Sequence, residues 1–267
     1  MIDPFENFPT KLEDARILVS NDDGINAPGL KVMEKIAREL SKDVWVVAPE
    51  MEQSGAGHSL TLHEPLRIRR INAKRFAVNG TPTDCVLLAI KAIIPKKKKR
   101  VHLVLSGVNR GANLAEDVTY SGTIAAAMEG TLLEVPSIAF SLNMQDGEDP
   151  RWNVAEKFGA EVVRKLVSQQ WPDNTLINVN FPDVPPSQVK GIKLAPLGKR
   201  QINEKVVKRL DPKGRPYYWV GGPLKDDYDR PGVDLVWINE GYITITPLGL
   251  DLTDYKQMER LREHMEA

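Results

Sequence analysis

The stretch ILVSNDDGINAPGLKVMEKIAREL, residues 17–40, decides the fold because it joins an apolar run, a polar loop and a helical pattern. The apolar run ends on Asp22 and Asp23, and Gly24 then lets the backbone turn sharply. Pro28 marks the start of the helical pattern. The apolar residues of that pattern fall on one stripe: Leu30, Met33, Ala37 and Leu40. A strand, a loop and a helix in this order predict the first unit of an α/β fold.

Short apolar runs rich in β-branched residues recur along the chain. The expected strands are 16–20, 43–49, 101–107, 136–142 and 175–181. Continuous apolar runs indicate strands that are buried on both faces. A helical pattern recurs at 152–166, so we expect a three-layer α/β fold with a mostly parallel sheet between helices. In such sheets ligands bind beyond the carboxyl ends of the strands.

The pattern of alternating strands and helices ends near residue 190. Residues 191–267 contain charged turns, two β-rich runs and a charged tail from Thr253, which predict a β-hairpin and an amphipathic C-terminal helix. We therefore divide the chain into a catalytic core at 1–190, with an N-terminal extension at 1–14, and an arm at 191–267. Such arms commonly serve contact between subunits.

Composition and charge exclude several function classes. Lys plus Arg and Asp plus Glu both number 36, so no global field draws the chain to nucleic acid or to a membrane surface. The run PKKKKR (95–100) is interpreted as a solvated turn, with a nucleic-acid contact as the alternative. The single cysteine, Cys85, permits no internal disulfide. Without a signal-peptide pattern or a span of about 20 apolar residues, a cytoplasmic protein is expected.

Two adjacent aspartates at the end of a buried strand repel each other unless a cation, a proton or a strong donor lies between them. Asp22 and Asp23 supply the hard anionic oxygens that Mg²⁺, Mn²⁺ and Ca²⁺ prefer. In the alternative interpretation, one aspartate caps the following helix and the other is solvated. The motif alone does not decide between the two.

Two further loops follow predicted strands. EMEQSGAGHSLT (50–61) contains His58, which is either a structural or a catalytic histidine. In the other loop, Ser121, Gly122 and Thr123 precede an alanine-rich helix and present N–H groups and hydroxyls that suit a phosphate, unless they only cap that helix. A parallel sheet brings all three loops to one edge, and a metal beside a phosphate predicts phosphoester hydrolysis. No P-loop or GxGxxG motif is present.

Five ordered motifs resemble those of the SurE family of 5′-nucleotidases. They are ILVSNDDGINAPGL, VVAPEMEQSGAGHSLT, VNGTPTDCVLLA, LVLSGVNRGANLAEDVTYSGTIAAAMEG and GYITITPL, and the resemblance extends from Ala15 to about Leu248. The resemblance implies a Rossmann-like core and a metal-dependent phosphatase that acts on nucleoside 5′-monophosphates. It also implies 3′-nucleotidase and exopolyphosphatase side activities, and homodimers or homotetramers formed through the C-terminal arm.

The resemblance also implies roles for individual residues. The ligands of one Mg²⁺ or Mn²⁺ ion per subunit would be Asp22, Asp23, Ser54 and Asn109. The phosphate pocket would be lined by Ser106, Gly107, Asn113, Ser121, Gly122 and Thr123. Asp22, Asp23 and His58 would be catalytic, and no spacing argument assigns the proton to one of them. Asn79, Gly80 and Thr81 would lie next to the site.

Two other function classes compete with a phosphatase. A nucleotide sensor on the same fold would bind phosphate without hydrolysis, although the four intact metal ligands argue against it. An RNA-binding protein that uses PKKKKR would show affinity that falls steeply with salt. We expect a nucleoside monophosphate substrate, no nucleic acid and no membrane.

Overall fold

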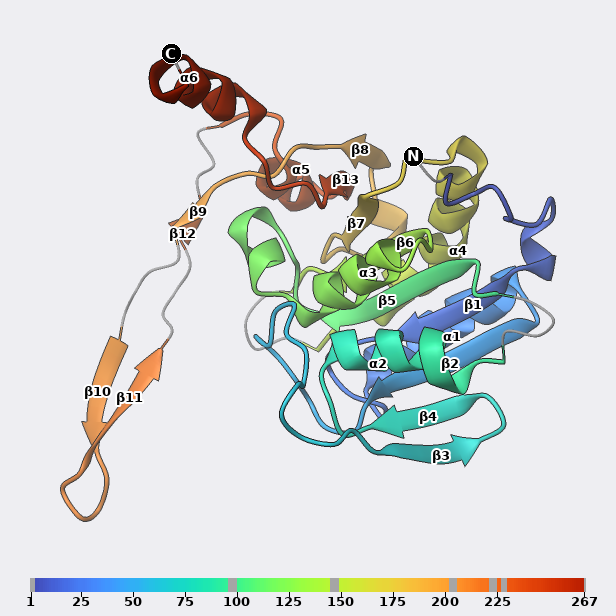
Figure 1. Cartoon of the computed structure of the whole chain (residues 1–267), viewed down its shortest axis with the longest axis horizontal. Helices are drawn as coiled ribbons and strands as arrows, with labels where there is room; N and C mark the ends of the chain where they lie inside the picture. The colour runs from blue at the N-terminus through green and yellow to red at the C-terminus, as the bar shows by residue number, and fades with distance from the viewer. Residues whose placement is uncertain are drawn as a thin grey trace.

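The computed structural model describes residues 3–95, 100–144, 149–201, 206–220, 225–226 and 230–266. Within this part of the chain, a nine-stranded mixed sheet has the strand order β3-β4-β2-β1-β5-β6-β7-β13-β8 (Figure 1). The run from β4 to β7 is parallel, whereas β3 pairs antiparallel to β4 and β13 antiparallel to β7. The expected α/β class with a mostly parallel sheet is confirmed.

The strands of the main sheet have these bounds: β1 Arg16–Ser20, β2 Asp43–Pro49, β3 Ile68–Asn72, β4 Arg75–Val78, β5 Leu103–Arg110, β6 Ser137–Leu142, β7 Thr175–Phe181, β8 Ile192–Leu194 and β13 Ile243–Gly249. Two smaller pairs are formed by β9 Arg200–Gln201 with β12 Lys225–Asp226, and by β10 Val206–Leu210 with β11 Pro216–Val220. The α-helices are α1 Pro28–Leu40, α2 Pro82–Leu88, α3 Gly122–Leu132, α4 Trp152–Gln169, α5 Asp234–Asn239 and α6 Tyr255–Met265.

Helices cover both faces of the sheet because its central strands bury side chains in both directions. Along β1, Ile17 and Val19 pack in one apolar cluster with residues of α1 and α4. Leu18 points to the other face, where it packs in a second cluster with Cys85 of α2 and with α3. Burial on both faces explains why the apolar run is continuous in sequence, and it agrees with the position of β1 between β2 and β5 inside the sheet.

Several expected elements agree closely with the structure. The predicted strands 16–20, 43–49 and 175–181 coincide with β1, β2 and β7, and the helix expected at 28–40 is α1. The strand expected at 101–107 instead runs from Leu103 to Arg110, with a shift of register against β6 between Ser106 and Asn109. Beyond Ser106, where its pairing with β1 ends, β5 continues beside β6 as far as Arg110, which lies near the loop after β1.

The division at residue 190 does not hold for the sheet. β8 and β13 both lie beyond that residue, yet β13 pairs with β7 over Ile243–Gly249 and with β8 on its other side. The sequence analysis did not expect either strand in the core. The hairpin of β10 and β11 and the helix α6 project from the body, as an arm would (Figure 1).

The N-terminal extension packs against the core. Phe5 is 4% exposed and belongs to the same apolar cluster as β1. Its ring meets that of Trp171 edge to face, with 4.8 Å between the centroids. An edge-to-face aromatic pair adds to the free energy gained by burial. Residues 3–14 therefore extend the hydrophobic core.

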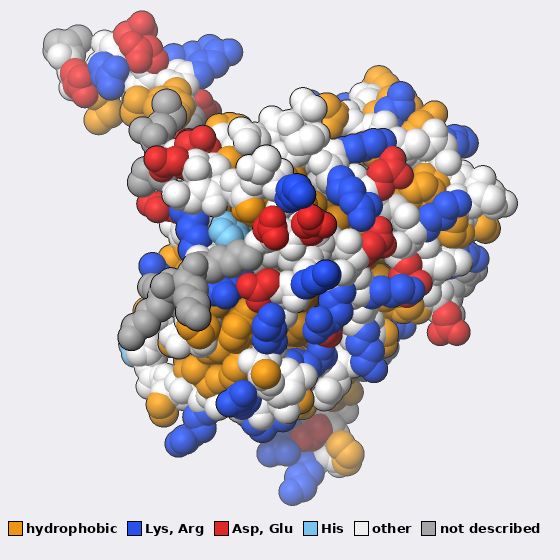
Figure 2. All heavy atoms as spheres, turned by 90° about the vertical axis from the view of Figure 1, so that its right-hand side faces the viewer, with side chains coloured by type: hydrophobic (Ala, Val, Ile, Leu, Met, Phe, Trp, Pro, Cys, Tyr) orange, Lys and Arg blue, Asp and Glu red, His pale blue; other side chains and the backbone are white. Residues whose placement is uncertain are grey.

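Acidic and basic side chains are mixed on the face where the parallel strands begin (Figure 2). Asp43 accepts from Arg16 Nε at 2.9 Å and from Lys74 Nζ at 2.8 Å. Burial raises the pKa of Asp43, but these bonds outweigh it and lower the pKa to about 2. Lys96–Lys99, the centre of the PKKKKR run, lie outside the described residues. Among the described residues, no helix is long and apolar enough to cross a membrane.

Close approach of α1 to β5 generates a stability prediction. A Cβ atom on Gly29 would lie 1.9 Å from the carbonyl oxygen of Val108, which is backbone and cannot rotate away. We expect Gly29→Ala to lower the free energy of unfolding by about 2–3 kcal/mol, despite the better helix propensity of alanine. Urea unfolding followed by circular dichroism measures this.

Gly249→Ala is the matched control, since nothing lies within 4 Å of a Cβ atom there. It should change the free energy of unfolding by no more than about 0.5 kcal/mol. Equal effects of the two substitutions would contradict this account of α1 packing.

Candidate active site

The three predicted loops meet at the carboxyl edge of the sheet. The Gln53 N–H donates to the Asp22 carbonyl oxygen at 2.8 Å and joins the loop after β2 to the loop after β1. The Arg110 N–H approaches Asp23 Oδ2 at 3.4 Å and joins the end of β5 to the same loop. The Gly57 N–H donates to the Tyr120 carbonyl oxygen at 3.2 Å. Loops far apart in sequence therefore form one site.

Asp22 is buried, at 4% exposure, against the first turn of α3. Its Oδ1 accepts a hydrogen bond from Thr123 Oγ1 at 2.5 Å. A Cβ atom on Gly122 would lie 2.7 Å from the Asp22 Cβ atom, so a larger residue at position 122 would push the two elements apart. Burial raises the pKa of Asp22, even though hydrogen bonds from Thr123 oppose the rise.

Asp23 lies beside it and is partly exposed. Burial, and then the negative charge of Asp22, raise the pKa of Asp23 to about 6. Within the described residues, the hydrogen bonds to these two carboxylates come from Thr123 and from the Arg110 backbone rather than from a Lys or Arg side chain. The pair therefore has an unmet demand for positive charge.

Ser54 and Asn109, the other two predicted metal ligands, lie next to residues that bond the aspartates. Ser54 follows Gln53, is exposed, and donates its hydroxyl to Glu52 Oε1 at 2.8 Å. The Asn109 side-chain nitrogen donates to the Gly111 carbonyl oxygen at 2.9 Å. That bond uses the nitrogen, so the side-chain oxygen is the atom that remains for a ligand.

The start of α3 has the features of an anion site. The hydroxyl of Ser121 accepts from the Ile124 N–H at 3.1 Å and caps the helix, as the alternative interpretation expected. The first bond between backbone groups of the helix runs from the Ala125 N–H to the Ser121 carbonyl. The N–H groups of Gly122 and Thr123 therefore have no carbonyl partner within the helix, and they add to its positive end.

Ser106 and Gly107 lie deeper than the helix start. Ser106 is fully buried, and its hydroxyl has no hydrogen-bond partner among the described residues. Ser20 pairs with Ser106 in the register of β1 and β5, and its buried hydroxyl also has no hydrogen-bond partner among the described residues. At Gly107, where φ is +124°, a Cβ atom would lie 2.2 Å from the Phe140 carbonyl oxygen. Only glycine fits this approach to β6.

Asn113 is buried and holds its loop against β6 and β7. Its side chain donates to Ser141 Oγ at 2.7 Å, and its N–H donates to Asn180 Oδ1 at 2.8 Å. Its carbonyl oxygen accepts from the side chains of Asn178 and Asn180. The sequence analysis missed these two asparagines, whose signal is a polar residue at every second position of the otherwise apolar strand β7.

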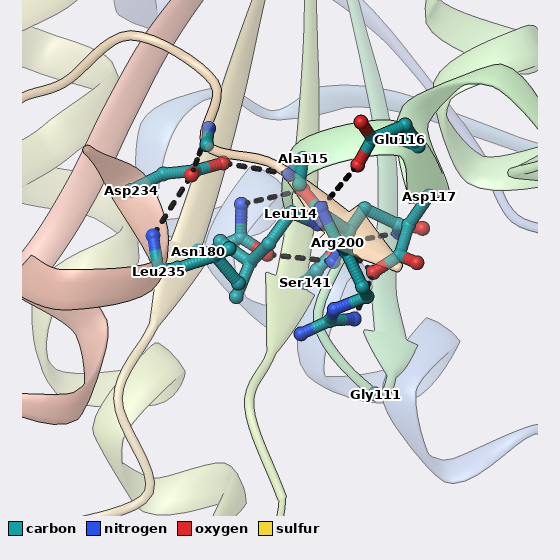
Figure 3. A network of polar contacts seen from close by, with 12 residues as sticks. Gly111, Leu114, Ala115, Glu116, Asp117, Ser141, Asn180, Arg200, Asp234 and Leu235 are labelled. Atoms are coloured by element: carbon teal, nitrogen blue, oxygen red, sulfur yellow. Dashed lines mark hydrogen bonds and ion pairs between the residues drawn. The ribbon is translucent and has the colours of Figure 1, made fainter. Parts of the chain in front are cut away.

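A second network holds the same loop from the side of the arm (Figure 3). Asp234 is fully buried and accepts from the Ala115 N–H at 2.9 Å and the Gly198 N–H at 2.7 Å. Arg200 forms an ion pair with Asp117, and its N–H donates to Glu116. None of these contacts was expected, because they join segments between 36 and 119 residues apart in the chain.

His58 points to α3. Its Nε2 lies 3.1 Å from Oε2 of Glu129, which is 7% exposed. The pair orients the imidazole beside the site without assigning its task. Glu129 was not expected, although an acidic residue in an alanine-rich helix is a signal for such a partner.

Asn79 and Thr81 lie next to the loop that carries Ser54 and His58, and they hold its end in place. The Asn79 side chain accepts from the Arg67 N–H at 2.5 Å. Thr81 and Asp84 form a capping box at the start of α2, and the Thr81 hydroxyl donates to the Ser59 carbonyl oxygen. This fixes the end of the loop that carries Ser54 and His58. Asp84 and Cys85, on the first turns of the same helix, are both buried.

The donor set fits a hard divalent ion. Among the described residues, no group of three His, Cys, Asp or Glu side chains forms a metal cluster. The convergent donors are two carboxylates, with the neutral oxygens of Ser54 and Asn109 on the adjoining loops. Mg²⁺ and Mn²⁺ bind such oxygens and keep further positions for water and substrate.

Comparison with known proteins identifies the family of the chain. The family model described as "Survival protein SurE" matches residues 17–204. The 5′-nucleotidase SurE of Paramagnetospirillum magneticum is 54% identical over 246 residues, which cover 92% of this chain and 94% of that protein. The protein of the same name from Parvibaculum lavamentivorans is 52% identical over 251 residues, covering 93% of this chain and 90% of that one.

A solved structure extends the match to three dimensions. The crystal structure of the SurE protein from Aquifex aeolicus is 40% identical and superposes with a TM-score of 0.80. The superposition covers 94% of this chain and 100% of the Aquifex aeolicus chain. With its family motif, its relatives and its fold in agreement, the chain belongs to the SurE family.

Proposed function

We propose that the chain is a metal-dependent 5′-nucleotidase that hydrolyses nucleoside 5′-monophosphates to a nucleoside and phosphate. The observation that carries the proposal is the pair of carboxylates at Asp22 and Asp23, held against the start of α3. This arrangement demands a cation on one side and offers N–H donors to an anion on the other. The activity in the names of the relatives is the one that this chemistry serves.

For the metal, we propose Asp22, Asp23, Ser54 and Asn109 as ligands of one Mg²⁺ or Mn²⁺ ion per subunit. When bound, such an ion polarises a phosphoryl oxygen and lowers the pKa of a bound water. Its positive charge would offset both the burial and the mutual repulsion that raise the pKa of Asp23. The two aspartates would then be ionised at neutral pH.

For the substrate, we propose that the phosphate lies at the N-terminus of α3. The Gly122 N–H group would donate to its oxygens, together with the Ser121 hydroxyl, while Thr123 holds Asp22 in place. Ser106 and Gly107 line the floor of the site, and Asn113 acts by holding the loop in place. The proton is handled by Asp22, Asp23 or His58, and the pairing of His58 with Glu129 supports a role in stabilising charge.

For assembly, we propose that the arm joins copies of this chain into a homodimer or homotetramer. Tyr218, Trp219 and Val220 of β11 are between 57% and 84% exposed. On α6, Tyr255, Met258 and Leu261 are also exposed and recur at the spacing of one helix face. Large apolar side chains in this number favour contact with another protein surface. The cytoplasmic location stays a prediction.

The activity itself is the first test. Purified protein with Mn²⁺ or Mg²⁺ should release phosphate from AMP or GMP, and EDTA should abolish the release because the two carboxylates need the cation. A colorimetric phosphate assay measures this, and 3′-AMP and polyphosphate in the same panel test the side activities. Turnover that is indifferent to EDTA would overturn the proposal.

Asp22→Asn separates charge from shape at the proposed metal site. We expect kcat to fall by about 100-fold or more and calorimetry to show much weaker Mn²⁺ binding, because the amide carries no charge. In EDTA the variant should unfold no earlier than the parent, since burial already disfavours the ionised Asp22.

Asp14→Asn is the control, since Asp14 is exposed and precedes the opposite end of β1. It should retain the kcat and the Mn²⁺ affinity of the parent. If Asp22→Asn also retained both, the ligand assignment would be wrong.

Trp219→Glu tests the proposed assembly. A charge on the exposed face of β11 should reduce the mass measured by light scattering to that of one chain, 29.8 kDa, because burying an unpaired carboxylate is unfavourable. Lys42→Glu, an exposed change on the core, should leave the mass of the parent unchanged. A parent that already has the mass of one chain would refute the proposal.

A further inference from the structure

A cleft of about 580 Å³ opens beside Asp23, between the N-terminal ends of α1 and α4. We propose that this cleft, the Trp152 cleft, binds the nucleoside base, with Trp152 as the residue on which the base stacks. Its lining includes Asp23, Pro28, Gly29, Glu52, Arg110 and Trp152. The link to catalysis rests on the proposed function, whereas nucleoside binding by the cleft does not.

The position of the cleft matches the shape of a nucleotide. Asp23 belongs both to the cleft and to the pair of carboxylates, so the cleft begins where the proposed metal site ends. A substrate with its phosphate at α3 would extend its sugar and base away from the buried Asp22. The cleft volume lies within the range of about 300–1,000 Å³ that is usual for small-molecule sites.

The ring of Trp152 packs closely against α1 at Gly29, which has no side chain to keep it away. A Cβ atom at Gly29 would lie 3.0 Å from the ring atom Cη2 of Trp152, so the ring rests on the first turn of α1. Trp152 is the first residue of α4 and is only partly buried. An indole fixed against a helix, with part of its surface open to a cleft, suits a flat aromatic ligand.

The charges of the cleft favour a neutral base over a second phosphate. Asp23, Glu52 and Asp149 bring three carboxyl groups to the lining, against one guanidinium from Arg110. Carboxylates accept hydrogen bonds from the amino and ring N–H groups of a base, and they repel additional anionic groups. Ala27 and Pro28 add apolar surface to the lining beside Trp152. The cleft therefore fits the base of a nucleoside monophosphate.

Trp152→Leu and Trp152→Phe test this inference as a matched pair. Both retain an apolar contact with α1, but only phenylalanine retains an aromatic face. With AMP, we expect Trp152→Leu to raise KM about 10-fold and Trp152→Phe to raise it no more than about threefold, because stacking on an aromatic ring is lost only in the leucine variant. With ribose 5-phosphate, which has no base, KM should stay within about twofold of the parent in both variants.

Binding of adenosine in EDTA provides a readout without catalysis. In saturation-transfer NMR, the base protons of adenosine should receive saturation from the parent and from Trp152→Phe, and at most half as much from Trp152→Leu. If the parent bound adenosine in this way but hydrolysed no phosphate ester, the proposed function would fail and the base site would stand. Equal KM changes for AMP and ribose 5-phosphate, or adenosine signals that Trp152→Leu leaves intact, would overturn the base site.

Discussion

The contact between the buried Asp22 carboxyl group and the first turn of α3 is the constraint on which the rest of the site depends. It joins the end of β1 to a helix that begins 100 residues later, through the Thr123 hydroxyl at 2.5 Å and the missing side chain of Gly122. The helix N-terminus offsets part of the negative charge, and the remainder calls for a cation. Metal and phosphate chemistry thus arise from one packing contact.

Buried hydrogen-bond networks hold the loops around this contact on the side that faces the protein interior. The side of the loops that faces the proposed substrate stays polar and open. Asn113 is clamped by the asparagines of β7, and Asp234 fixes the loop before α3 from the side of the arm. These networks are buried and well paired, so they can position donors to a fraction of an ångström. The Trp152 cleft continues the open front of the site beyond Asp23.

The sequence predicted the parts of the fold that local patterns determine. β1, α1, β2 and β7 follow from apolar periodicity, and the meeting of three loops follows from parallel topology. Periodicity could not reveal that β13 returns to pair with β7, because antiparallel pairing with a distant segment leaves no local signal. The same reason hid the Asp234 contacts and the Trp152 cleft, which depend on residues brought together only by the fold.

A crystal of the protein grown with Mn²⁺ tests the central claim most directly, because anomalous scattering locates that ion without reference to activity. The account predicts an anomalous peak in contact with the carboxylate oxygens of Asp22 and Asp23, and next to Ser54 and Asn109. A peak elsewhere, or none at these aspartates at a Mn²⁺ concentration that supports turnover, would contradict it.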